Sequence, residues 1–101
     1  RFRMRTPRFP AVTRDVTLVV DRGTEAQAVL DAIAGMEVRL LERIQVVAVF
    51  DGDPVPAGKR SLSFRLTYRS PDQTLEDGEV NALQQTVTDR LLNEFRASLS
   101  G

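Results

Sequence analysis

The sequence predicts an α+β sandwich in which two helices cover one face of an antiparallel sheet. Two observations predict this fold class. Residues 61–69 alternate apolar and polar side chains with a period of two, which is the pattern of a strand with one buried face. Residues 24–35 and 77–95 carry apolar side chains at helical spacing along one side only, as helices that pack on a sheet do.

The first predicted strand spans residues 14–21. Its apolar side consists of Val16, Leu18 and Val20. The helix predicted over 24–35 begins with Thr24 as its N-cap, and Gln27 three residues later completes a capping box. Gly35 is a typical residue for the end of a helix.

A hairpin is predicted in the middle of the chain. Residues 44–51 form its first strand, and residues 36–43 are either a loop or the start of that strand. Residues 52–58 contain two glycines and two prolines, which indicates a loop, and the strand over 61–69 follows it. Residues 96–101, after the second helix, are either a short last strand centred on Leu99 or a frayed end.

This order of elements is that of a ferredoxin-like split βαβ sandwich, in which the first and third strands lie side by side in the centre of the sheet. Ser63 and Arg65 should therefore lie near Thr17 and Val19. Residues 14–101 are predicted to form this domain. Residues 1–13, with two prolines and four arginines, are predicted to be a basic N-terminal arm or linker.

The composition argues against most catalytic chemistry. The chain has no cysteine and no histidine, so it lacks the thiolate ligands of zinc, the cysteine nucleophile and the commonest general base. We expect no catalysis, metal or cofactor in this chain. No apolar run has the length of a membrane span and no secretory signal opens the sequence, so a cytoplasmic location is expected.

The positive charge is concentrated in two blocks, although the net charge is zero. Residues 1–14 hold five arginines and no acid, and the polar side of the strand over 61–69 carries arginines and hydroxyls and no acid. Such a face suits the phosphates and sugars of RNA. The candidate RNA-binding residues are Arg14, Lys59, Arg60, Ser61, Ser63, Arg65, Thr67 and Arg69.

Two further expectations concern this face. Phe64 and Tyr68 point toward the helices by alternation, so the face should lack rings that stack on bases and should contact the RNA backbone. Asp15 and Asp51 are expected to pair with Arg14 or Lys59 at the ends of the sheet.

Four segments together resemble one family. They are FPAVTRD (residues 9–15), FD (50–51), GKRSLSFRL (58–66) and TLEDGEV (74–80). The chain is similar in these segments to the ferredoxin-fold anticodon-binding domain that closes the beta subunit of bacterial phenylalanine–tRNA ligase. The tyrosine that often follows the FD pair in that family is replaced here by Gly52-Asp53.

The resemblance implies a role in protein biosynthesis. The domain would hold the anticodon stem-loop and help to select tRNA(Phe) for aminoacylation. The parent enzyme would be an ATP- and Mg-dependent α2β2 aminoacyl-tRNA synthetase, with its catalytic site in the alpha subunit.

Two other functions remain open from the residues alone. One is a small-molecule or protein-docking module on the same fold, with Val19, Val47 and Val49 as an exposed patch. The other is an independent enzyme such as an acylphosphatase. That enzyme requires a glycine-containing loop that surrounds a phosphate after the first strand. DRGTEAQ (residues 21–27) has one glycine but does not have the pattern of such a loop.

Overall fold

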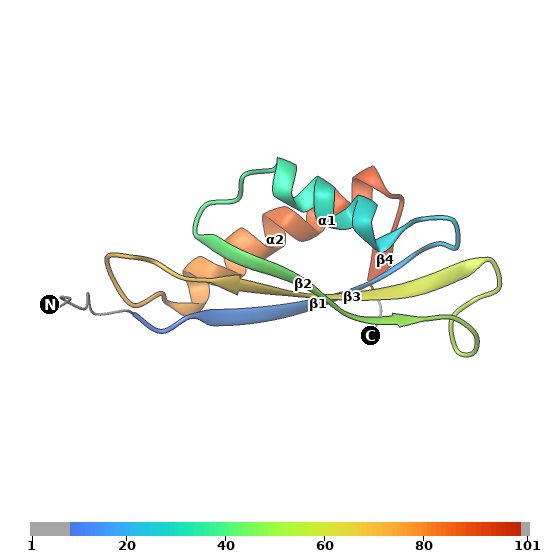
Figure 1. Cartoon of the computed structure of the whole chain (residues 1–101), viewed down its shortest axis with the longest axis horizontal. Helices are drawn as coiled ribbons and strands as arrows, with labels where there is room; N and C mark the ends of the chain where they lie inside the picture. The colour runs from blue at the N-terminus through green and yellow to red at the C-terminus, as the bar shows by residue number, and fades with distance from the viewer. Residues whose placement is uncertain (1–8, 100–101) are drawn as a thin grey trace, which may run out of the picture.

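The computed structural model describes residues 9–99. Its elements are β1 (Val12–Asp21), α1 (Ala26–Gly35), β2 (Leu41–Phe50), β3 (Lys59–Tyr68), α2 (Asp77–Glu94) and β4 (Ser98–Leu99). The four strands form one antiparallel sheet in the order β2-β3-β1-β4, and both helices lie on the same side of it (Figure 1). This arrangement confirms the predicted ferredoxin-like fold class.

The core lies between the sheet and the two helices. The alternation predicted for β3 is confirmed, because its apolar residues are all fully buried: Leu62, Phe64, Leu66 and Tyr68. Val16, Leu18 and Val20 of β1 are buried beside them. The helices contribute Val29 and Ile33 from α1 and Val80, Val87 and Leu91 from α2. Burial of this apolar side chain area is the main term that stabilises the sandwich.

The central strands pair as the topology predicts. Thr17 lies opposite Ser63, and Asp15 lies opposite Arg65, in the antiparallel ladder between β1 and β3. The side chains at such facing positions lie on the same side of a sheet. The first and third strands are therefore adjacent, and they carry the polar positions of the sheet together.

The prediction of a capping box at α1 was wrong. The helix begins at Ala26, its N-cap residue is Glu25, and Glu25 makes no side-chain capping hydrogen bond. The N–H of Thr24 instead donates to the carbonyl of Asp21, so Thr24 belongs to the turn after β1. Gln27 donates to the Asp31 carboxylate within the helix, at 2.9 Å.

Strand β2 is longer and less regular than the sequence pattern indicates. It begins at Leu41, and its pairing with β3 shifts at two points, between Leu41 and Arg43 and between Val46 and Ala48. An extra residue at such a bulge reverses which side of the sheet each following side chain faces. The loop to β3 contains Gly52 and Gly58 at φ values of 89° and 80°, a conformation that favours glycine.

Neither helix within residues 9–99 has the length and apolar character needed to cross a membrane.

Candidate nucleic-acid interface

The side of the sheet opposite the helices is uncovered by any residue that the structure describes. We call it the open face. It consists of Thr13, Asp15, Thr17, Val19 and Asp21 from β1, of Lys59, Ser61, Ser63, Arg65 and Thr67 from β3 with Arg69 directly after it, and of Arg43, Gln45, Ala48 and Phe50 from β2. Most of the predicted RNA-binding residues of β3 are therefore brought together on one surface.

Arg14 and Arg60 are not part of the open face. Arg14 alternates with the open-face residues of β1, and its guanidinium contacts helix α2, at 3.0 Å from Asn81 Oδ1 and 3.2 Å from Asp77 Oδ1. Arg60 lies opposite the buried Val20 and reaches the carboxylate of Asp51 at 3.6 Å. The structure thus separates these two arginines from the other candidate residues.

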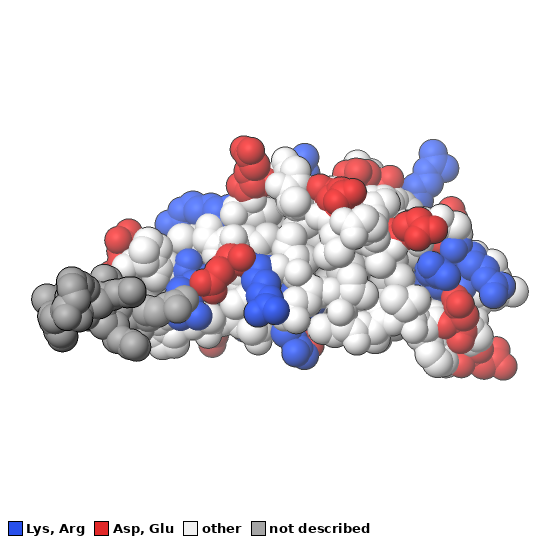
Figure 2. All heavy atoms as spheres, viewed as in Figure 1, with Lys and Arg blue, Asp and Glu red and all other residues white. Residues whose placement is uncertain are grey.

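The neighbouring strands add acids to the face that β3 presents. Three cations of the open face are each paired with a carboxylate from another strand. The pairs are Arg65 with Asp15 at 2.9 and 3.0 Å, Lys59 with Asp21 at 2.8 Å, and Arg69 with Glu42 at 3.1 Å. β3 has no acid of its own, but β1 and β2 place acids beside it. On the side of the molecule that Figure 2 shows, basic and acidic side chains are also interleaved.

The pairing predicted for Asp15 and Asp51 was wrong. Asp15 takes Arg65 as its partner, and the hydrogen bond from Arg65 holds the pKa of the Asp15 carboxyl below its usual value. The hydrogen bond from Lys59 lowers the pKa of Asp21 in the same way. Both carboxylates are therefore charged at neutral pH, and the positive charge of the face is locally compensated.

The centre of the open face is neutral and is made of small side chains. The hydroxyls of Thr17 and Ser63 are hydrogen-bonded to each other at 2.8 Å. Val19, Ser61 and Ala48 occupy neighbouring positions of the same ladders. This centre is bounded by the Lys59–Asp21 pair on one side and the Arg65–Asp15 pair on the other. It offers hydroxyl groups and short side chains rather than a cluster of free cations.

One aromatic ring lies on the open face, and the sequence reasoning missed it. Phe50 is opposite Ser61, and its side chain is 50% exposed. Alternation from Ile44 would place Phe50 toward the helices, but the bulge between Val46 and Ala48 reverses the direction. No signal in the apolar run of residues 46–50 locates that bulge, so only the paired strands reveal it.

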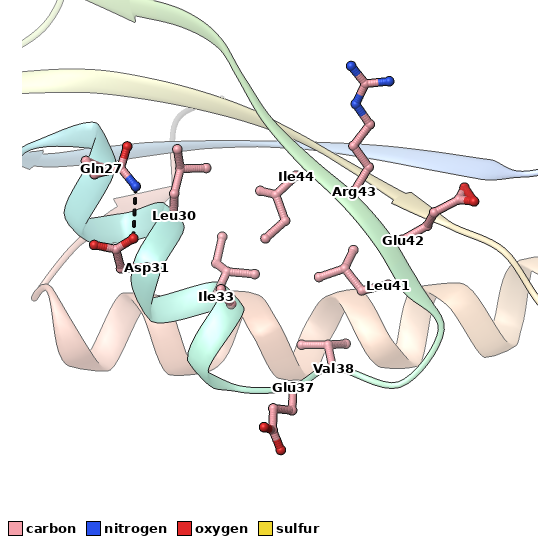
Figure 3. Close-up of a pocket in the computed structure, with 11 residues that line it drawn as sticks. Gln27, Leu30, Asp31, Ile33, Glu37, Val38, Leu41, Glu42, Arg43 and Ile44 are labelled. Atoms are coloured by element: carbon pink, nitrogen blue, oxygen red, sulfur yellow. Dashed lines mark hydrogen bonds between the residues drawn. The ribbon is translucent and has the colours of Figure 1, made fainter.

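A concave surface lies on the helix side, between α1 and β2 (Figure 3). It encloses about 410 Å³, and its apolar lining residues include Leu30, Ile33 and Ile44. Figure 3 shows Leu41 and Ile44 turned toward α1, and Glu42 and Arg43 turned away from it. Within residues 9–99, no group of three or more His, Cys, Asp or Glu side chains is placed to hold a metal ion.

Comparison with known proteins agrees with the geometry. The family whose sequence model matches is the "Ferredoxin-fold anticodon binding domain", over residues 7–100. The chain is 45% identical over 93 residues to the phenylalanine–tRNA ligase beta subunit of Moorella thermoacetica. It is 42% identical over 95 residues to that of Geobacillus kaustophilus and 41% identical over 95 residues to that of Anaeromyxobacter dehalogenans.

These matches cover 92% to 94% of this chain and 12% of each relative. The chain therefore spans about an eighth of the length of these relatives. The uncovered four-stranded sheet, its strand order and the match over residues 7–100 lead to one conclusion. The chain belongs to the family of ferredoxin-fold anticodon-binding domains.

Proposed function

We propose that this chain binds the anticodon stem-loop of tRNA(Phe) through its open face, as part of the beta subunit of a phenylalanine–tRNA ligase. The relatives bear that name, and the matched region covers nearly all of this chain. In the parent enzyme the domain helps to select the tRNA. Aminoacylation, its ATP and Mg requirement and the alpha subunit of the α2β2 assembly belong to the rest of that enzyme.

The observation that carries this proposal is the position of Phe50 beside a row of small side chains. Phe50, Ser61 and Val19 face one another across three adjacent strands. An exposed ring next to short side chains accepts an unpaired base by stacking, and the adjacent hydroxyls form hydrogen bonds with sugar or base edges. A duplex does not present its bases in this way, so the preferred ligand is a single-stranded loop.

The ion pairs change the expected balance of contacts. Since Lys59, Arg65 and Arg69 already contact carboxylates, a phosphate must compete with those carboxylates for each cation. The interface therefore relies more on the loop bases than a free basic face would. Arg43 lies opposite Thr67 on the open face, and no carboxylate among the described residues forms an ion pair with it. Arg43 is therefore the cation that a phosphate can contact without displacing a carboxylate.

The test compares two hairpins that share one stem. The first carries the anticodon loop of tRNA(Phe), and the second closes the same stem with a compact tetraloop. We expect the 101-residue chain to bind the first hairpin more tightly, measured by fluorescence anisotropy at two salt concentrations. Equal binding of the two hairpins would show that the loop is not the ligand, and the proposal would then be wrong.

A second candidate function is protein docking, which the exposed valines of β2 favour. Val46, Val47 and Val49 are 36%, 41% and 51% exposed, and β2 is the outermost strand on its side of the sheet. An outer strand with apolar side chains is a typical site for pairing with another chain. Light scattering of the purified chain distinguishes this function. A dimer that Val47→Lys converts to a monomer would favour it.

A further inference from the structure

The strongest feature that the proposed function leaves unexplained is the acid placed next to each main cation of the open face. A surface built only to attract RNA would leave its cations free. Here each of the three cations is hydrogen-bonded to a carboxylate, from Asp15, Asp21 or Glu42. Each of these pairs joins two different strands or their ends. The acids therefore need a role of their own at this surface.

The Arg65–Asp15 pair shows the arrangement most clearly. Both side chains lie on the open face, opposite each other in the β1–β3 ladder, and two hydrogen bonds of 2.9 and 3.0 Å join Nε and Nη2 to the two carboxylate oxygens. This two-fold contact holds the guanidinium plane against the carboxylate. The side chains remain 46% and 52% exposed, so an incoming phosphate can reach the pair.

We propose that Asp15 is a specificity-determining residue, which acts by holding Arg65 and so suppresses the binding of RNA that offers only phosphate. This inference rests on the proposed function of the open face. A duplex, which offers no unpaired base to Phe50, must displace the carboxylate and also bring its own charge near it. A loop that stacks a base on Phe50 gains enough from that contact to exchange partners at Arg65. Specificity of this kind comes from a penalty on the wrong ligand.

The electrostatics make the effect measurable. Each cation that neutralises a phosphate steepens the plot of log affinity against log salt by about 0.7 for single strands and about 0.9 for duplexes. If Asp15→Asn frees Arg65, the slope should steepen by about that amount. At salt concentrations from 50 to 150 mM, the Asp15→Asn chain should bind RNA without the anticodon loop about threefold to tenfold more tightly than the wild-type chain does. The reason is the one added phosphate contact.

The experiment measures three ligands with each variant: the anticodon hairpin, the tetraloop hairpin and a blunt-ended RNA duplex of the stem sequence. Asp15→Asn should raise affinity for the last two more than for the first, which lowers the preference for the anticodon loop. Asp31→Asn is the matched control. It removes the same charge from helix α1, where the Asp31 carboxylate accepts a hydrogen bond from Gln27 and not from a residue of the open face.

Two variants keep the test decisive. Arg65→Ala in the Asp15→Asn chain should abolish the gain, because the gain requires the freed guanidinium. Asp21→Asn should release Lys59 and produce a similar steepening, which covers the case in which Asp15→Asn does not fold. Circular dichroism and the melting temperature verify the fold of each variant.

The outcomes separate the two proposals. The specificity role of Asp15 is overturned if Asp15→Asn and Asp31→Asn show the same salt slope on the blunt-ended duplex, or if the gain survives the loss of Arg65. It is also overturned if Asp15→Asn tightens all three ligands equally. The proposed function itself is refuted by a different result, in which the wild-type chain binds the two hairpins with equal affinity.

Discussion

Phe50 lies opposite Ser61 in the ladder between β2 and β3, on the face of the sheet that the helices leave uncovered. Its neighbour Val49 lies opposite the fully buried Leu62 and therefore faces the other side. The bulge between Val46 and Ala48 produces this arrangement, because it exchanges the faces of the residues that follow. A single extra residue thus places an aromatic ring on the uncovered face.

The first prediction tests that ring. Phe50→Ala should weaken binding of the anticodon hairpin by about tenfold, since stacking of one base on an aromatic side chain contributes about 1–3 kcal/mol. Phe50→Tyr should retain binding, because it keeps the ring. The measurement is fluorescence anisotropy with a labelled hairpin.

Val49→Ala is the matched control for this prediction. It removes an apolar side chain of similar exposure, 51% against 50%, from the adjacent position of the same strand. Because Val49 faces away from the open face, its loss should leave hairpin affinity unchanged. If Val49→Ala and Phe50→Ala weaken binding equally, the stacking role of Phe50 is refuted.

The second prediction concerns Arg69, which was a candidate RNA contact. Its N–H donates to the carbonyl of Leu40, its Nε contacts both oxygens of Glu42 at 3.1 Å, and its Nη1 donates to the carbonyl of Phe9. Arg69 therefore joins the end of β3 to the start of β2 and to the segment that leads into β1. We expect Arg69→Ala to lower the free energy of unfolding by about 1–2 kcal/mol.

Urea denaturation followed by circular dichroism measures this change. Arg69→Lys should restore little of the lost stability, because an ammonium group cannot contact Glu42 and Phe9 with the geometry of a guanidinium. Thr67→Ala, on the same face two residues earlier, is the comparison and should change stability by less. A fully stable Arg69→Ala chain would show that the side-chain contacts of Arg69 with Glu42 and Phe9 contribute nothing to stability.

The third prediction concerns pH. Burial raises the pKa of the Tyr68 phenol to about 12, and its hydroxyl donates to Gln84 Oε1 at 2.7 Å. In the unfolded chain the phenol ionises near pH 10. Since the folded state has the higher pKa, the contribution of Tyr68 to stability is complete below about pH 10 and is lost as the pH rises toward 12.

Tyr68 is the only tyrosine of the chain, so ultraviolet difference absorbance follows its ionisation directly. Tyr68→Phe should be less stable near neutral pH by about 1 kcal/mol, because the hydrogen bond to Gln84 is lost. Its stability should then fall less steeply between pH 10 and 12 than that of the wild-type chain. A wild-type tyrosine that titrates near pH 10 in the folded state would contradict the buried position.

The fourth prediction compares two facing residues of β2 and β3. Phe64 is fully buried and lies opposite Val46, which is 36% exposed. Phe64→Ala should lower the free energy of unfolding by about 3–5 kcal/mol, because it leaves a cavity in the core. Val46→Ala should cost less than about 1 kcal/mol, because its site is open to water. Equal losses in urea denaturation would show that the core is centred elsewhere.

Periodicity was a reliable guide wherever one side of an element is buried. Leu62 to Tyr68 alternate in the sequence and in the core, because a strand has only two sides and water excludes apolar groups from one of them. The helix stripes around Ile33 and Leu91 follow from the same principle. The four linked segments that resemble the family likewise agree with its match over residues 7–100.

Helix ends and charge pairing were less predictable. Thr24 and Gln27 have the residue types of a capping box, yet the turn after β1 takes up Thr24 before the helix begins. The acids that neutralise Arg65 and Lys59 lie more than 35 positions away in the sequence. Charge counted along the chain does not reveal such neighbours, because they become adjacent only when strands pair.

The fold class, the central strand pair, the buried side of β3 and the hydroxyl groups of the open face could all be predicted from the amino-acid sequence. These features depend on local periodicity and on the order of elements, which a linear chain carries. The charge compensation of the open face and the position of Phe50 on it became evident from the folded chain. Both depend on register between strands, and register is set by pairing and by a bulge that no local pattern specifies.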